Sequence, residues 1–223
     1  FVGGWLQREL AQAGHDVVTA PGPDALDIAD REALIRWFSD GPDAVAHLAG
    51  MAFAPDARGD PAEAFRVNVG GTIAVFEALR ALGLRPPVLV TGSSEVYGAP
   101  RAQDLPLRED APIAPRQPYG VSKAAQEGVA IEAAVRWAFP VVVTRSFNHS
   151  GPGQRPVFVL PALARRVAPD AGAHFGAIAF QVDAPFQVIG GGAHILLDVA
   201  NVAPVAGGDV AIDRLALFHQ AGE

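Results

Sequence analysis

Tyr119 and Lys123, four residues apart, are the pair in this sequence best suited to carry out chemistry. They follow Pro118 and open an alanine-rich segment, a pattern that predicts the first turns of a helix. Residues four apart lie on one face of a helix. We therefore expect the lysine ammonium to lie beside the phenol and to lower the tyrosine pKa from its usual value of about 10. Such a phenol gives or takes a proton near neutral pH.

The rarity of these residue types strengthens that interpretation. Lys123 is the only lysine in a chain of 223 residues, and Tyr119 is one of two tyrosines. By chance, a single lysine falls four residues after a tyrosine in roughly one such chain in a hundred. The alternative is an exposed lysine and a packed tyrosine on an ordinary helix, and the spacing alone leaves that alternative open.

The bulk composition excludes several classes of protein. Half of the residues are apolar, the formal net charge is -7, and there is no cysteine. The acidic balance and the lack of a basic cluster argue against a nucleic-acid partner. The six histidines show no metal-ligand spacing, so we predict no metal site. No signal peptide or long uncharged apolar run is visible, which predicts a cytoplasmic protein without a membrane partner.

Apolar runs that alternate with helical patterns must position the pair. The runs at residues 43–50, 88–92 and 141–145 read as buried parallel strands, and 31–39, 61–82 and 119–138 as helices. This alternation predicts an α/β fold with a doubly wound parallel sheet. Ser93, Ser94, Asn148 and Gln154 follow strand ends, where ligands of such sheets bind. A polar turn with self-bonded serines is the alternative for the first two.

The first residues read as the second half of a dinucleotide-binding unit. A helical pattern up to Gly14 precedes a strand at residues 15–19. Gly3 would then be the last glycine of a glycine-rich fingerprint, although a structural turn explains it equally well. The strand that opens such a unit would precede Phe1 and lie in mid-sheet. We therefore expect a gap in the sheet and a sequence that is a fragment.

Seven motifs occur in an order that resembles the extended short-chain dehydrogenase/reductase family of sugar-nucleotide epimerases, dehydratases and reductases. The last loop and the S-S-E segment look most like GDP-6-deoxy-4-keto-hexose reductases. The motifs are F-V-G-G at 1–4, D-I at 27–28, H-L-A-G at 47–50, N-V-x-G-T at 68–72, T-G-S-S-E-V-Y-G at 91–98, Y-G-V-S-K at 119–123 and R-S-F-N-H-S-G-P-G-Q at 145–154.

The resemblance implies a Rossmann-like doubly wound sheet with helices on both faces and a small, partly missing substrate-binding lobe. We expect an NAD(P)-binding domain over residues 1–167, without its first strand. We expect an atypical remainder of the substrate-binding region over residues 168–223. The resemblance stops near Val167, and the R-D-F-x-D-V-x-D stretch expected of the family is missing from this sequence.

The resemblance also implies roles for the catalytic candidates. Tyr119 would be the acid/base, and Lys123 would lower its pKa and bind the nicotinamide ribose. Ser93 would hold the C4 oxygen of the sugar, with Ser94 as the alternative. Glu95 matches a position that serves as a base in dehydratases and that in a reductase would only position the substrate.

The implied cofactor is NAD or NADP. The sequence does not distinguish the two, because the strand that ends at Thr19 carries neither an acidic ribose ligand nor an arginine. The remaining expected contacts follow the path of the cofactor. Gly3 would lie by the pyrophosphate, Asp27 and Ile28 by the adenine, and Leu48, Ala49 and Gly50 along the cofactor. Thr91 would lie near the nicotinamide, and Phe147, Asn148 and His149 between the nicotinamide and the substrate phosphates. Asn148 and Gln154 would form hydrogen bonds with the substrate.

The resemblance implies an oxidoreductase that reduces the C4 ketone of a nucleotide-linked 6-deoxy-hexulose, with a GDP-linked sugar as substrate and a homodimer as the assembly. A 4-epimerase and a 4,6-dehydratase are alternatives within the family. An inactive nucleotide-binding sensor or scaffold is the alternative from another class, because fold alone does not determine function.

Overall fold

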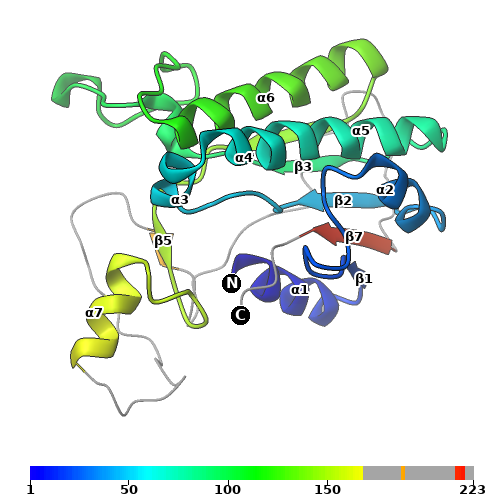
Figure 1. The fold of residues 1–223 in the computed structure, drawn as a ribbon, viewed down its shortest axis with the longest axis horizontal. Coiled ribbons are helices and arrows are strands. Elements are labelled where there is room, and N and C mark those ends of the chain that lie inside the picture. The colour runs from blue at the N-terminus through cyan, green and yellow to red at the C-terminus, as the bar shows by residue number, and fades with distance from the viewer. Residues whose placement is uncertain (168–186, 189–213, 219–223) are drawn as a thin grey trace.

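The protein, described here by a computed structural model of residues 1–167, 187–188 and 214–218, contains a five-stranded parallel sheet (Figure 1). The strand order is β1-β7-β2-β3-β4, and every pair of neighbours runs parallel. The strands are β1 (Asp16–Thr19), β2 (Ala44–His47), β3 (Val88–Thr91), β4 (Val141–Thr144) and β7 (Arg214–Phe218).

Helices cover both faces of this sheet, as Figure 1 shows, so the predicted α/β fold with a doubly wound sheet is confirmed. Val45, Val88 and Val90 pack with α2, α5 and α6, whereas Ala44 and Ala46 pack with α1 on the other face. The helices are α1 (Val2–Gln12), α2 (Arg31–Trp37), α3 (Ala54–Gly59), α4 (Pro61–Phe65), α5 (Gly71–Ala81), α6 (Pro118–Trp137) and α7 (Val159–Val167), with short 3-10 helices at Ser94–Tyr97 and Ala102–Asp104.

Helix ends follow from local sequence chemistry. The Asp30 carboxylate accepts from Ala33 N at the start of α2, as the sequence predicts. The Asp60 carboxylate accepts from Glu63 N in the same way at the start of α4. The helix predicted over residues 61–82 is continuous but contains a π-helix, Arg66–Gly70, between α4 and α5. Such π-turns are rare and often lie at functional sites.

The strand β7 corrects one expectation. The mid-sheet gap predicted from the sequence is filled by residues 214–218, which lie between β1 and β2 (Figure 1). Ala216 pairs with Val18 on one side and with Val45 on the other. These residues therefore belong to the sheet and not to the substrate-binding lobe. Apart from β7 and β6 (Gln187–Val188), which pairs with β5 (His149–Ser150), the segment predicted as that lobe lies outside the described residues.

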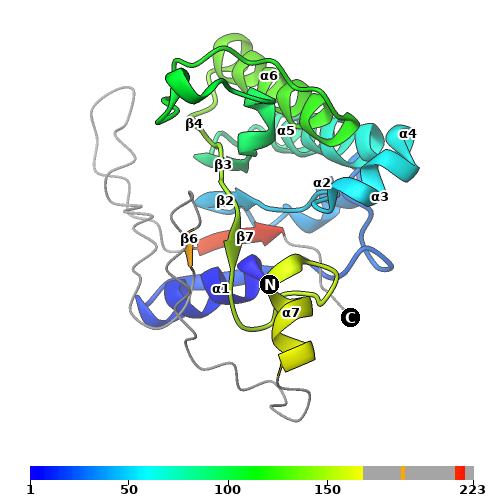
Figure 2. The same cartoon turned by 90° about the vertical axis from the view of Figure 1, so that its left-hand side faces the viewer.

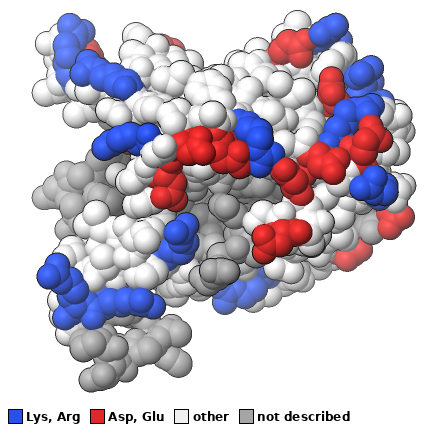
Figure 3. Space-filling view, viewed as in Figure 1, with Lys and Arg blue, Asp and Glu red and all other residues white. Residues whose placement is uncertain are grey.

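Charged side chains of both signs are interspersed on the face drawn in Figure 3. Arg66, for example, forms ion pairs with Asp27 and with Glu63. Within the described ranges, no helix combines the length and apolar character that a membrane crossing needs. The same ranges contain no group of three or more histidine, aspartate or glutamate side chains arranged to hold a metal ion.

Candidate active site

Tyr119 and Ser93 meet where α6 begins beside the end of β3. A hydrogen bond with the Ser93 side chain acts on the Tyr119 phenol, and the charge of Glu95 also reaches it. Gly120 makes this approach sterically feasible, because a Cβ at that position would lie 2.7 Å from the Glu95 carbonyl oxygen. The structure thus brings together the predicted acid/base, the predicted oxygen-binding serine and the predicted substrate-positioning glutamate.

Lys123 lies one turn further along α6, with only 5% of its surface exposed. Its Nζ donates to the Thr91 carbonyl oxygen at 2.9 Å and to Gln126 Oε1 at 2.9 Å. A Cβ at Gly50 would lie 3.4 Å from Nζ and 2.7 Å from Asn68 Oδ1. The chain after β2 therefore approaches the lysine only because residue 50 is glycine. The ends of β2 and β3 and the first turns of α6 thus meet at the amine.

The π-helix anchors the first turn of α6. Asn68 is fully buried, accepts from Met51 N at 2.8 Å through Oδ1, and donates to Ser122 Oγ at 2.9 Å through Nδ2. Ser122 in turn donates to the Tyr119 carbonyl oxygen at 2.8 Å. The backbone of the candidate acid/base is therefore tied through two side chains to the segment that follows β2.

The structure corrects the predicted pKa of Tyr119. Burial of the phenol is the largest influence and raises its pKa, the hydrogen bond with Ser93 lowers it, and the charge of Glu95 raises it, with a raised pKa as the result. Lys123 is not among the groups that shift the phenol. Its amine is directed to Thr91 and Gln126. In this structure Tyr119 is therefore a protonated phenol at neutral pH.

Burial has the opposite effect on the amine, and lowers the pKa of Lys123 to about 8. The unfolded chain has the ordinary lysine pKa of about 10.4. Above pH 8 the folded protein releases this proton while the unfolded chain keeps it, so the free energy of unfolding rises with pH until the unfolded lysine also titrates. Below pH 8 both states carry the proton, and this contribution is constant.

We therefore expect the free energy of unfolding to rise by about 2 kcal/mol between pH 8 and pH 9.5, and the Lys123→Met variant to lack this rise. Urea unfolding at several pH values measures both. Arg136→Met is the matched control, because it removes an exposed cation from the same helix and should keep the rise. The same slope in Lys123→Met and in the parent protein would contradict the lowered pKa.

The loop after β4 lies against the start of α1. The His149 ring stacks on Phe1 with centroids 5.9 Å apart, and Trp5 Nε1 donates to the Pro152 carbonyl oxygen at 3.0 Å. Gly3 is buried in the first turn of α1. Figure 2 shows the N-terminus beside this part of the chain. The residues predicted for the pyrophosphate and for the nicotinamide end, Gly3 and His149, thus lie on neighbouring segments.

The two residues predicted to flank the adenine have protein partners. The Asp27 carboxylate accepts from Ala29 N at 2.9 Å and from Arg66 at 2.7 Å, and these contacts lower its pKa. Ile28 is 8% exposed, and its side chain packs closely against Gly71. Of the two, the half-exposed Asp27 side chain is the more accessible to a ligand.

The other predicted contacts differ in exposure. Leu48, Ala49, Thr91, Ser94 and Phe147 are partly buried, and Asn148 is exposed. The Gln154 side chain bonds within its own loop, since Oε1 accepts from Ser150 at 2.7 Å and Nε2 donates to the His149 carbonyl at 3.3 Å. The predicted substrate contact of Gln154 would compete with these bonds, so the structure gives it no support.

Sequence reasoning missed the side chains behind the lysine. Gln126, Thr72 and His47 are fully buried and hydrogen-bonded in series. It also missed Arg145, which pairs with the buried Glu127 and donates to Tyr97 Oη at 3.0 Å. A polar residue three positions after Lys123 on the same helix face was the available signal for Gln126.

Known proteins are similar to this chain in both sequence and fold. GDP-6-deoxy-D-mannose reductase from Pseudomonas aeruginosa is 38% identical over 168 residues, 75% of this chain and 55% of that protein. UDP-glucose 4-epimerase from Lacticaseibacillus casei is 31% identical over 166 residues, 68% of this chain and 49% of that protein. The solved structure of RMD from Pseudomonas aeruginosa, complexed with NADPH, is 38% identical with a TM-score of 0.70, over 75% of this chain and 57% of that chain.

The chain thus spans about half the length of the curated relatives it matches. The model of the NAD dependent epimerase/dehydratase family matches residues 1–187, which include Tyr119, Lys123 and Ser93, so this chain belongs to that family.

Proposed function

We propose that this chain forms the cofactor-binding and catalytic part of an enzyme that uses NADPH or NADH to reduce the 4-keto group of a nucleotide-linked 6-deoxy-hexulose. The contact between a protonated Tyr119 and Ser93, one helical turn from the buried Lys123, carries the proposal. Similarity to a GDP-6-deoxy-D-mannose reductase supports a GDP-linked substrate.

The residues of the site suit the cofactor. Lys123 Nζ has three N–H donors, and the described residues provide two acceptors for them, Thr91 O and Gln126 Oε1, so within this part of the chain a third donor remains for a ribose hydroxyl. The first turn of α1 contains no acidic residue, which leaves its N-terminal amides suitable for a pyrophosphate. Gly50 keeps the path beside the lysine free of a side chain.

The proposed reaction divides its work between the cofactor and the side chains. When bound, the reduced cofactor would be the source of the hydride that C4 of the sugar receives. The Ser93 hydroxyl and the Tyr119 phenol donate hydrogen bonds to the ketone oxygen and hold it in place. As negative charge develops on that oxygen, Tyr119 transfers its proton to it, and the alcohol forms. Lys123 would hold the ribose through its remaining N–H donor.

A protonated Tyr119 suits the reduction of a ketone. Reduction of a ketone begins with a protonated acid, and the raised pKa of Tyr119 provides one at neutral pH. Epimerisation and dehydration both begin by oxidation of an alcohol, which needs the phenolate first. The exposed Glu95 beside the phenol is the feature that would serve a dehydratase.

Purified protein tests the proposal directly. Incubation with NADPH or NADH and a GDP-linked 4-keto-6-deoxy-hexose should consume the reduced cofactor and yield the 4-hydroxy sugar. Conversion of UDP-glucose to UDP-galactose without net cofactor change would instead establish an epimerase, and formation of a 4-keto-6-deoxy product from a nucleotide hexose would establish a dehydratase. Cofactor binding without turnover of any of these substrates would favour a sensor or scaffold.

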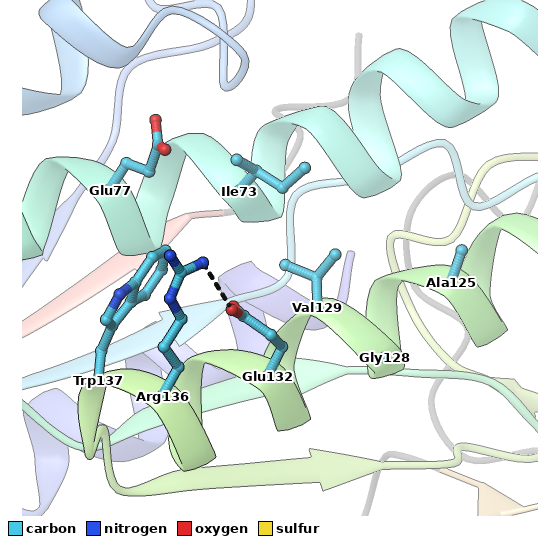
Figure 4. A pocket seen from close by; sticks show the side chains of 8 residues that line it. All are labelled: Ile73, Glu77, Ala125, Gly128, Val129, Glu132, Arg136 and Trp137. Atoms are coloured by element: carbon cyan, nitrogen blue, oxygen red, sulfur yellow. Dashed lines mark hydrogen bonds and ion pairs between the residues drawn. The ribbon is translucent and has the colours of Figure 1, made fainter.

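We also propose a homodimer formed through α5 and α6. A groove between these helices is lined by both apolar and charged side chains (Figure 4), which are Ile73, Glu77, Ala125, Gly128, Val129, Glu132, Arg136 and Trp137. Next to it, Val135 is 82% exposed and Ile131 is 53% exposed. Exposed apolar side chains gathered on one helix pair are typical of an interface between copies.

Replacement of Val135 by aspartate is therefore expected to shift the protein from dimer to monomer at micromolar concentration, because each copy would bury an unpaired carboxylate. Light scattering after size-exclusion chromatography measures the mass. Val159→Asp is the matched control, since Val159 is also largely exposed (74%) but lies on α7. A parent protein that is already a monomer would contradict the dimer.

A further inference from the structure

A series of buried side chains leads from Lys123 to the central strand β2. Gln126 Oε1 accepts from Lys123 Nζ at 2.9 Å, and Gln126 Nε2 donates to Thr72 Oγ1 at 2.9 Å. His47 Nε2 lies 2.9 Å from the same Thr72 hydroxyl. Gln126, Thr72 and His47 are each 0% exposed. Side chains from α6, α5 and β2, which lie next to one another in Figure 1, are thereby linked behind the amine.

The donors and acceptors of this series allow one arrangement. A lysine ammonium only donates, so the oxygen of the Gln126 amide must face it and the NH2 group must face Thr72. The Thr72 hydroxyl gives its one proton to the Asn68 carbonyl oxygen at 2.7 Å, and so accepts from both Gln126 and His47. His47 Nε2 therefore carries a proton on a neutral ring, in keeping with burial that lowers the pKa of His47 to about 3.

We propose that Gln126 is a positioning residue, which orients the Lys123 amine by fixing it to Thr72 and His47. With the Thr91 carbonyl as its only acceptor, the amine could rotate about that one bond. A second acceptor fixed by two further partners determines the direction of the remaining N–H donor as well. The catalytic role of this arrangement rests on the proposed function, in which the remaining N–H donor of Lys123 binds the ribose.

Among the residues that the structure describes, three titratable groups are linked to this part of the site. His47 on β2 feels the charge of Lys123, Tyr119 precedes Lys123 on α6, and Glu95 acts on Tyr119 from the 3-10 helix Ser94–Tyr97. Gln126 itself does not titrate. A change of its side chain therefore alters the lysine through a direct contact and adds no second titration, except in the glutamate variant.

The single lysine of the chain makes a direct test available. Labelling with [13Cε]-lysine gives one signal, whose pH titration reports Lys123 alone. Gln126→Met removes the acceptor, and should lower the lysine pKa by about one pH unit. Gln126→Glu places a carboxylate at the same point, and should raise the pKa by about one to three units. Opposite shifts in the two variants would establish direct contact in solution.

Glu127→Gln is the matched control. Glu127 is the next residue of α6 and is also buried (6% exposed), but its partner is Arg145, so the variant should perturb the helix without moving the lysine titration. One titration curve shared by the parent, Gln126→Met and Gln126→Glu would overturn the proposal. So would equal shifts in the Glu127→Gln control.

Kinetics separate this proposal from the proposed function. With the reductase substrates, Gln126→Met should lower kcat about tenfold or more and weaken cofactor binding, and Gln126→Glu should recover part of the loss at a shifted pH. If the two Gln126 variants shift the Lys123 pKa in opposite directions but the protein reduces no sugar, Gln126 remains a positioning residue and the reductase assignment is wrong. Normal kcat, cofactor affinity and pH profile in Gln126→Met would remove the positioning role and keep the reductase.

Discussion

Replacement of Tyr119 by phenylalanine is expected to lower kcat for ketone reduction by about 10²- to 10⁴-fold, the range typical for loss of a general acid. The variant keeps the aromatic ring, which is partly buried at the start of α6, but loses the proton that the proposed reaction transfers to the substrate oxygen. Binding of NADPH should change little, because Lys123 and its partners remain. Steady-state kinetics and cofactor titration measure the two quantities separately.

The second tyrosine of the chain provides the control. Tyr97 Oη accepts from Arg145 at 3.0 Å and has no placement in the proposed chemistry, so Tyr97→Phe should retain kcat while losing a little stability. A Tyr119→Phe variant with the kcat of the parent protein would refute the assignment of the acid. Equal loss of kcat in both variants would show that phenol removal acts through folding.

The activity should also fall at high pH as the phenol titrates. Burial and the Glu95 charge raise the pKa of Tyr119, so the proton needed for reduction stays in place through neutral pH. The sequence did not predict this raised pKa, because a lysine at helical spacing predicts a lowered pKa for Tyr119. The spacing places two residues on one face, but it carries no information on burial or on which acceptors the amine finds.

Local patterns, by contrast, predicted the elements that position the site. Asp30 and Asp60 cap the helices as their spacing indicates, and the apolar runs at residues 43–50 and 88–92 contain β2 and β3. These features depend on neighbouring residues only. The contacts of Lys123 with Thr91, and through Gln126 with Thr72 and His47, join three segments distant in sequence, and no local pattern encodes them.

The position of β7 is the clearest case of long-range information. The run at residues 214–218 is short, and its sequence does not say which strands it joins. The partners become clear only in the folded sheet, where β7 lies between the facing edges of β1 and β2 and pairs in parallel with both. A central position leaves no unpaired strand edge there, which stabilises the sheet that carries His47 and Gly50.

Replacement of Ala216 by proline is therefore expected to lower the free energy of unfolding by about 3 kcal/mol or more. Ala216 is the central residue of β7 and pairs with Val18 and with Val45. Proline has no N–H to donate, leaves a carbonyl of a neighbouring strand without its partner, and is excluded sterically from central strands. Since domains of this kind are stable by only about 5–15 kcal/mol, urea unfolding would detect the change readily.

Ala216→Ser is the control for that variant, because serine keeps the backbone N–H and differs little in size. It should unfold close to the parent midpoint. The proline variant should also bind NADPH more weakly, because a loosened β7 frees β2, whose carboxyl end leads to Gly50 and the lysine site. If proline at position 216 changed neither unfolding nor cofactor binding, residues 214–218 would not form the central strand in solution, and another segment would have to fill the space between β1 and β2.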